Sequence, residues 1–240
     1  MNVGAVAADL SGAQFANGID YAFPANTVLA PGARVVVNEA QFRNGSRLSD
    51  GGERLTLVAA DGTTPIRDFR YGDSAPWPAP PDGTGPSLVL IAPNAAHATD
   101  VYHADGTHWR PSLTIGGNPG ASDATAFSGD PSADADADGL AALIEYALGT
   151  SDADAAQGRA ACTLTPDAAQ PGSYLFTFQR ASAADDVTCV VESSTDLLAW
   201  TPATGTPLRI VENGATRSFT YRLTLPGPPP RFFARLSITR

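Results

Sequence analysis

Carboxylates recur at a regular spacing in the segment 134–145, which reads Asp-Ala-Asp-Ala-Asp-Gly-Leu-Ala-Ala-Leu-Ile-Glu. They take positions one, three, five and twelve of a twelve-residue loop, and a glycine takes position six. Oxygen ligands at this spacing match the EF-hand-like calcium loop, because a hard divalent cation needs six or more oxygens around it. The predicted ligands of this calcium site are Asp134, Asp136, Asp138, the backbone carbonyl of Leu140, and Glu145.

The elements around this loop must hold it in place. Apolar residues at helical spacing, with Gly149 at the C-cap position, predict a helix over 139–148. The preceding Ser128–Ser132 contains glycine and proline and does not favour a helix. A single loop followed by one helix resembles the isolated calcium loops of dockerin-like and thrombospondin-type-3-like segments. The alternative interpretation is an Asp/Ala-rich linker that is kept soluble by its charge.

Composition favours an all-β protein of two domains. The chain has 240 residues with 23 Gly and 20 Pro, and a helical period occurs once, which is typical of many short strands joined by turns. The acidic, alanine-rich break in the middle suggests a division into domains at 1–122 and 159–240, with 123–158 as a calcium-binding linker. We expect the linker to carry the only helix.

The charge of the chain excludes some classes of partner. The net charge is −10, and 123–154 contains no Lys or Arg, so binding to nucleic acid is not expected.

No apolar run reaches eighteen residues, so we expect no membrane span. The first residues, Met1 to Gly4, lack the basic and apolar regions of a signal peptide. Either the chain is cytoplasmic or it is a piece of a longer exported protein, and we favour the second.

The N-terminal half alternates strand and turn patterns, as in a β-sandwich. Strands are expected at 21–23, 28–29, 34–37, 53–58, 66–71, 87–91 and 108–110, with turns such as Asp61-Gly62 between them. Several blocks in this half resemble the bacterial lamin-tail domain: Asp9–Gly12, 21–37, Leu48–Leu57, Phe69–Pro78, Trp109–Ser112 and Gly116–Ala121. The resemblance implies an immunoglobulin-like sandwich.

The same resemblance indicates a missing part. Members of that family begin with one or two strands upstream of the block at Asp9, and only Met1–Ala8 precede it here. A sandwich that lacks an edge strand exposes unpaired backbone and apolar surface. We therefore expect a fragment, or an edge that another chain or a second copy covers by self-association.

The C-terminal half shows a second series of alternating segments. Strands are expected at 162–164, 174–180, 187–193, 208–211, 218–223 and 232–238, which would form a smaller sandwich. The segments Glu192–Pro202 and Arg231–Leu236 resemble the C-terminal modules of exported proteins of Verrucomicrobia-type bacteria. Cys162 and Cys189 lie in two of these strands, and a disulfide between them is the prediction, with two buried thiols as the alternative.

Other candidate chemistry is weaker. His97, His103 and His108 lack the spacing of a zinc site, and no nucleophile or carboxylate pair for hydrolysis can be assembled. Tyr71, Trp77 and Trp109 are candidates for an aromatic platform that binds sugar rings, although packing is the preferred interpretation.

The leading hypothesis is a non-catalytic structural, adhesion or targeting module of a secreted or cell-surface protein, in which calcium stiffens the linker between domains. Binding of an extracellular polysaccharide is the alternative, binding of another protein is a further candidate, and a hydrolase fragment is the least favoured hypothesis.

Overall fold

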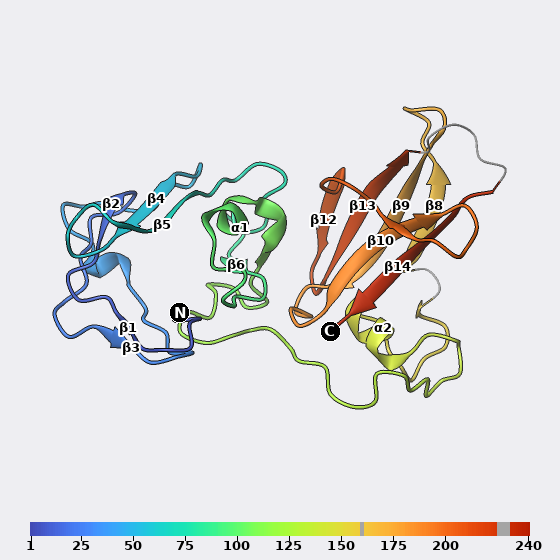
Figure 1. Ribbon diagram of the computed structural model, residues 1–240, viewed down its shortest axis with the longest axis horizontal. Helices are drawn as coiled ribbons and strands as arrows, with labels where there is room; N and C mark the ends of the chain where they lie inside the picture. The colour runs from blue at the N-terminus through green and yellow to red at the C-terminus, as the bar shows by residue number, and fades with distance from the viewer. Residues whose placement is uncertain (159–160, 225–230) are drawn as a thin grey trace. The chain divides into compact units, whose positions relative to one another are not determined.

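The computed structural model describes residues 1–158, 161–224 and 231–240 (Figure 1). Strands make up 30% of the chain and helices 8%, and the strands form several antiparallel sheets, so the all-β class is confirmed at this level. No helix among the described residues is long and apolar enough to cross a membrane. The chain divides into two compact units, Met1–Asp123 and Ala124–Arg240. Residue 159, the expected start of the C-terminal sandwich, lies outside the described residues.

The first unit contains seven of the named strands in three small sheets, with orders β1-β3, β2-β4-β5 and β6-β7. Its strands are β1 (Ala8–Asp9), β2 (Gln14–Asn17), β3 (Val28–Leu29), β4 (Arg54–Val58), β5 (Pro65–Arg70), β6 (Leu88–Leu90) and β7 (Trp109–Pro111). Its short helices are η1 (Glu39–Gln41), α1 (Asp100–Ala104) and η2 (Gly106–His108). Helix α1 lies against β5.

The core of the first unit gathers around four buried side chains, Ala13, Ile19, Tyr21 and Phe23. Tyr21 and Phe23 meet edge to face, with ring centroids 5.0 Å apart. Strand β4 contributes Leu57, which lies opposite Phe15 of β2 in the antiparallel register. The buried residues of β4 are Thr56 and Val58, which alternate with the half-buried Leu55 and Leu57, so both faces of the strand are at least partly covered.

Two predictions for the first unit are wrong. The segment Arg34–Val37 forms no strand, and 21–23 contributes one isolated bridge, between Ala22 and Gln14. A strand needs a neighbouring backbone, which its own β-branched residues cannot supply. Val35 and Val37 still pack against the core, and they border an apolar cavity of about 780 Å³. Helix α1 has no counterpart among the expected elements, so the prediction that the linker carries the only helix is also wrong.

The second unit contains a four-stranded sheet of order β12-β13-β9-β8 and a three-stranded sheet of order β11-β10-β14. Its strands are β8 (Cys162–Pro166), β9 (Ser173–Ala181), β10 (Thr188–Ser194), β11 (Thr201–Pro202), β12 (Arg209–Asn213), β13 (Thr216–Thr224) and β14 (Phe233–Thr239). All the strands predicted for this half are present. The longest pairing joins β13 to β9, with Phe219 opposite Phe178.

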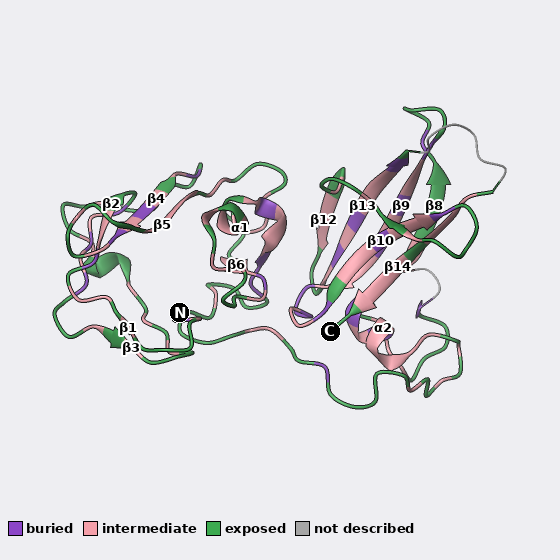
Figure 2. Cartoon of the chain, viewed as in Figure 1, coloured by how far each residue is buried: buried purple, intermediate pink, exposed green. Residues whose placement is uncertain are grey.

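Side chains from both sheets of the second unit share one apolar cluster. Phe176 and Phe178 of β9, Phe219 and Leu223 of β13, and Val191 of β10 are its buried members. Figure 2 shows the buried positions along β9 and β13. The aromatic rings of Phe178 and Phe219 stack with centroids 5.3 Å apart. Burial of side chains of this size supplies much of the stability of a small domain.

Helix α2 (Ala142–Leu148) packs against β9 and β14 of the second unit. Its Ala147 and Leu148 are buried, and Ala147 joins Ala184 and Val187 in a separate apolar cluster. The helix begins three residues later than the predicted 139–148, because the preceding residues belong to the aspartate loop. The predicted linker, 123–158, therefore lies within the second unit, Ala124–Arg240, except for Asp123, which ends the first unit.

The predicted disulfide is absent, since Cys162 and Cys189 are free thiols. Cys162 lies on β8 and Cys189 on β10, in different sheets, and both side chains pack against the shared apolar cluster. Burial raises the pKa of both thiols. Each cysteine therefore fills space as a small apolar side chain, which is the alternative that the sequence left open.

Candidate metal centre

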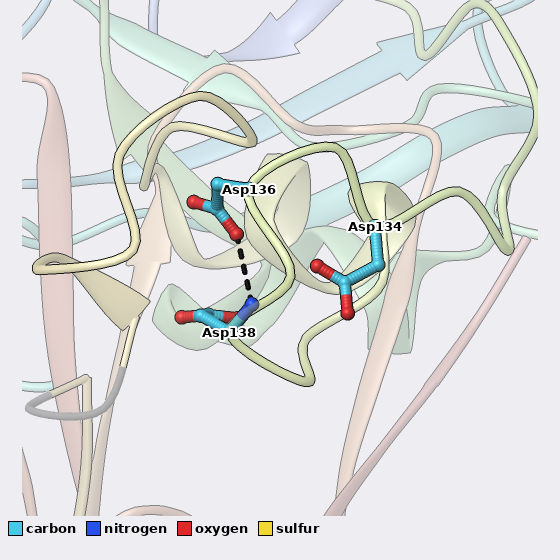
Figure 3. A group of neighbouring side chains, drawn as sticks. All are labelled: Asp134, Asp136 and Asp138. Carbon is cyan, nitrogen blue, oxygen red and sulfur yellow. Dashed lines mark hydrogen bonds between the residues drawn. The ribbon is translucent and has the colours of Figure 1, made fainter.

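Three aspartates gather on one curved loop between the Gly/Pro segment and α2 (Figure 3). One carboxylate oxygen from each of Asp134, Asp136 and Asp138 lies within 4.8 Å of the others. Among the described residues this is the only group of three or more carboxylate, imidazole or thiol side chains close enough to hold a metal ion. The loop spacing in the sequence therefore brings these three predicted ligands together.

Each aspartate uses one oxygen to fold the loop. Asp136 accepts a hydrogen bond from the backbone N–H of Asp138 at 3.1 Å (Figure 3), and Asp138 accepts one from Leu140 at 2.7 Å. Asp134 accepts from Gly139 at 3.1 Å. The loop turns sharply at Gly139, whose φ of 93° favours glycine. These bonds curl the backbone and leave a second oxygen on each aspartate.

Three carboxylate oxygens in this region are buried without a hydrogen-bond partner among the described residues. They are Oδ2 of Asp136, Oδ2 of Asp138 and Oε2 of Glu145. The Glu145 side chain is fully buried, with 0% exposure. A buried carboxylate without a partner costs several kcal/mol, roughly, unless a cation or donor compensates it. The residues present therefore fit a bound divalent cation.

Glu145 stands apart from the three aspartates in one respect, because it does not belong to the group whose oxygens lie within 4.8 Å. Burial raises the pKa of Glu145, and the charges of Asp136, Asp138 and Asp152 raise it further, against a hydrogen bond from Thr150 that lowers it. The charges of these three aspartates thus repel the Glu145 carboxylate. A cation that drew Glu145 toward the loop would relieve this repulsion.

The fifth predicted ligand, Leu140, follows the tight turn. No described residue donates a hydrogen bond to its backbone carbonyl, so the carbonyl oxygen has a lone pair to offer. The Leu140 side chain lies against Gly158, where a Cβ would come within 2.2 Å of Leu140 Cδ1 and 3.1 Å of Asp138 Oδ2. A larger residue at position 158 would therefore displace the Leu140 side chain.

Helix α2, which follows the aspartate loop, is fixed against the strands of the second unit. Its end is capped by Gly149, whose N–H bonds the carbonyls of Glu145 and Tyr146. Gln179 of β9 donates to the Leu148 carbonyl at 3.0 Å, and the Tyr146 hydroxyl donates to Asp186 at 2.7 Å. The position of Glu145 is therefore set by contacts with the sheet as well as by the helix itself.

Two residues near the site were missed by the sequence analysis. Asp152 accepts a hydrogen bond from the backbone N–H of Ala135 at 3.0 Å, and Thr150 donates to Glu145 Oε1 at 3.1 Å. Both follow the helix, outside the twelve-residue spacing. The sequence signal for these two residues is weak, since a Thr and an Asp shortly after a helix are common in proteins that bind no metal.

The aromatic candidates lie in the first unit. Tyr71 and Trp109 line a cavity of about 470 Å³ that Asp50, Asp73 and Asp82 also border. Trp77 is not among the lining residues but lies beside Trp109, with centroids 5.7 Å apart. Phe69 stacks on Trp109 as well, at 6.2 Å. Packing therefore accounts for much of the Trp77 and Trp109 surface, in line with the preferred interpretation.

Two of the three histidines stack on Tyr102, whereas His103 lies against Phe69 with ring centroids 5.2 Å apart. His97 and His108 lie nearly parallel to Tyr102, with centroids 4.1 and 3.8 Å from its ring. The Nδ1 atom of His97 lies 2.7 Å from the Ala92 carbonyl. This arrangement ties the loop around α1 together.

No protein-family model, curated protein or solved structure matches the chain.

Proposed function

We propose that this chain is a non-catalytic structural, adhesion or targeting module of an exported protein, and that calcium binds its aspartate loop. The observation that carries the proposal is the set of buried, unpartnered oxygens on Asp136, Asp138 and Glu145. The ligands of the ion would be Asp134, Asp136, Asp138, the Leu140 carbonyl and Glu145. An all-oxygen set dominated by carboxylates suits calcium, which accepts irregular coordination with six to eight ligands.

Calcium would act on the stability of the second unit. The bound ion neutralises carboxylates that otherwise repel one another, and it links the loop to Glu145 on α2. Because α2 packs against β9 and β14, an ordered loop would hold the helix on the sheet. The sequence led us to expect that calcium stiffens a linker between two domains. Because the loop and helix belong to the second unit, calcium would instead stabilise that unit.

Calorimetric titration of calcium into the chelator-treated protein tests the proposal. We expect one site with a dissociation constant in the micromolar to millimolar range. Asp136→Ala and Glu145→Gln should each abolish or strongly weaken binding. Glu39→Gln is the matched control, because it removes an exposed carboxylate in the first unit. Absence of binding to the wild-type chain, or equal binding to all variants, would overturn the proposal.

A second candidate function is carbohydrate binding in the cavity of about 470 Å³ in the first unit. Its volume lies in the usual range for small-ligand sites, and its apolar lining is bordered by the carboxylates of Asp50, Asp73 and Asp82, which can accept hydrogen bonds from sugar hydroxyls. Tyr71 is the aromatic lining residue whose ring has no aromatic stacking partner among the described residues.

Binding to a panel of bacterial oligosaccharides tests this second candidate. The double variant Asp73→Asn/Asp82→Asn should weaken binding while the fold is kept, since both side chains are exposed. Trp77→Ala is a poor probe, because Trp77 packs against Trp109 and Gly72. Binding that is insensitive to the double variant would place any sugar elsewhere.

A further inference from the structure

The chain after α2 returns to the aspartate loop. The helix is capped by Gly149, and within the next three residues Thr150 and Asp152 each contact a part of the predicted site. Thr150 contacts Glu145, the last predicted ligand. Asp152 contacts Ala135, which lies between the first two predicted ligands, Asp134 and Asp136.

We infer that Asp152 and Thr150 are positioning residues for the metal site, and that neither is itself a ligand. Asp152 holds the loop through the Ala135 N–H, and Thr150 holds the Glu145 carboxylate through Oε1. This inference rests on the proposed function, because it concerns how the same calcium site is preorganised.

The contact made by Asp152 acts on two ligands at once. Its Oδ1 accepts from the Ala135 N–H at 3.0 Å, and that amide stands between Asp134 and Asp136. Without an acceptor, this backbone group would be free to rotate, and the two neighbouring carboxylates would move with it. Asp152 has no oxygen among the buried, unpartnered ones of the described residues, which distinguishes it from Asp136, Asp138 and Glu145.

The contact made by Thr150 selects an orientation of Glu145. The Thr150 hydroxyl donates to Oε1 at 3.1 Å, and the Thr150 N–H bonds the Glu145 carbonyl at 3.0 Å. Oε1 is thereby occupied, while Oε2 stays buried and unpartnered. Fixing a ligand through its second atom reduces the conformational entropy lost when the ion binds. Groups that orient metal ligands in this way commonly change affinity by about 10- to 100-fold when removed.

Paired substitutions separate positioning from other roles. Asp152→Ala removes the acceptor, whereas Asp152→Asn keeps an oxygen that can accept from Ala135 and removes the charge. Thr150→Val removes the hydroxyl at nearly constant volume, whereas Thr150→Ser keeps it. Asp154→Asn is the control, because Asp154 carries the same charge nearby but bonds only to the local Ala156 and Gln157.

Calcium affinity of each variant is measured by calorimetry, and thermal unfolding in chelator is measured in parallel. We expect Asp152→Ala and Thr150→Val to weaken calcium binding by about 10- to 100-fold. Asp152→Asn, Thr150→Ser and Asp154→Asn should stay within a few-fold of wild type. A role in folding alone would lower the unfolding temperature in chelator and leave the affinity unchanged.

Three results would overturn the inference. Wild-type affinity in Asp152→Ala and Thr150→Val would show that the contacts do not position the ligands. Equal losses in Asp152→Asn and Asp152→Ala would show that Asp152 acts through its charge or as a ligand. If the wild-type chain binds no calcium, the proposed function falls as well, so the two failures are distinguished by the wild-type titration alone.

Discussion

Arg110 in the first unit and Glu145 in the second are both fully buried charged side chains, yet their surroundings differ. Arg110 pairs with Asp123 at 2.6 Å, and Asp123 also accepts from the Leu113 N–H. Glu145 bonds Thr150 through one oxygen, and its other oxygen has no partner among the described residues. The first charge is compensated within the chain, whereas the second is surrounded by more negative charge. This difference in charge compensation is the basis for the proposal that a cation binds in the second unit.

The largest expected effect comes from breaking the buried ion pair between Arg110 and Asp123 in the first unit. Asp123→Ala leaves the buried guanidinium of Arg110 without its carboxylate and should cost about 3–5 kcal/mol of unfolding free energy. Denaturant unfolding followed by tryptophan fluorescence in a Trp200→Phe background measures this, because Trp77 and Trp109 then report on the first unit alone. The control is Arg43→Ala, which breaks an exposed pair with Asp20 and should cost about 1 kcal/mol or less. If Asp123→Ala lowers the unfolding free energy no more than Arg43→Ala does, the interpretation of Arg110 as a compensated buried charge is contradicted.

Calcium should supply the missing compensation in the second unit. At a free concentration of about 100 times the dissociation constant, the ion should stabilise this unit by about 2.7 kcal/mol. Glu145→Gln should remove that gain. In chelator the same variant should match or exceed wild-type stability, since it removes a buried charge from repulsive surroundings. Thermal unfolding with and without calcium, followed by circular dichroism, checks both parts, and a large destabilisation in chelator would count against them.

The ion pair between Arg110 and Asp123 also predicts that the stability of the first unit depends on pH. Burial alone would raise the pKa of Asp123, but the hydrogen bonds from Arg110 and Leu113 outweigh it and lower the pKa below 3.8. A carboxyl group with a lowered folded pKa stabilises the fold fully above its unfolded value, and this stabilisation is lost as the pH falls through the folded value. We therefore expect the first unit to lose stability below about pH 3.8. Asp123→Asn should reduce this loss, as measured by denaturant unfolding at pH 2.5 to 5.

The smallest expected effect concerns how α2 is attached to the second unit. Tyr146→Phe removes the hydrogen bond to Asp186 and should cost about 1 kcal/mol of unfolding free energy. Calcium affinity should change little, because the Tyr146 hydroxyl does not contact the loop. Tyr174→Phe is the matched control in the same unit, since the Tyr174 hydroxyl bonds no described residue, and it should stay within about 0.5 kcal/mol. Equal effects of the two variants would show that the Tyr146 contact contributes nothing.

The strands of the second unit could be predicted from the sequence because each pattern is local. Alternation of Phe176 and Phe178 with polar residues identifies β9 without knowledge of its neighbours, and the same holds for β13. The first unit was harder to predict. Arg34–Val37 has the residues of a strand but no backbone partner, and α1 is too short to show a periodic pattern. The lamin-tail resemblance and the sandwich arrangement of both units stay predictions.

The sequence by itself determined the part of the candidate metal site that lies within one loop. Aspartates at alternate positions and a glycine at the turn bring Asp134, Asp136 and Asp138 near one another, because residues so close along the chain can meet within a single turn. Only the tertiary structure decided that Glu145 is buried, that Asp152 and Thr150 return to the loop, and that Arg110 meets Asp123. Burial and charge pairing depend on which segments pack against one another, and neighbours along the chain do not specify that packing.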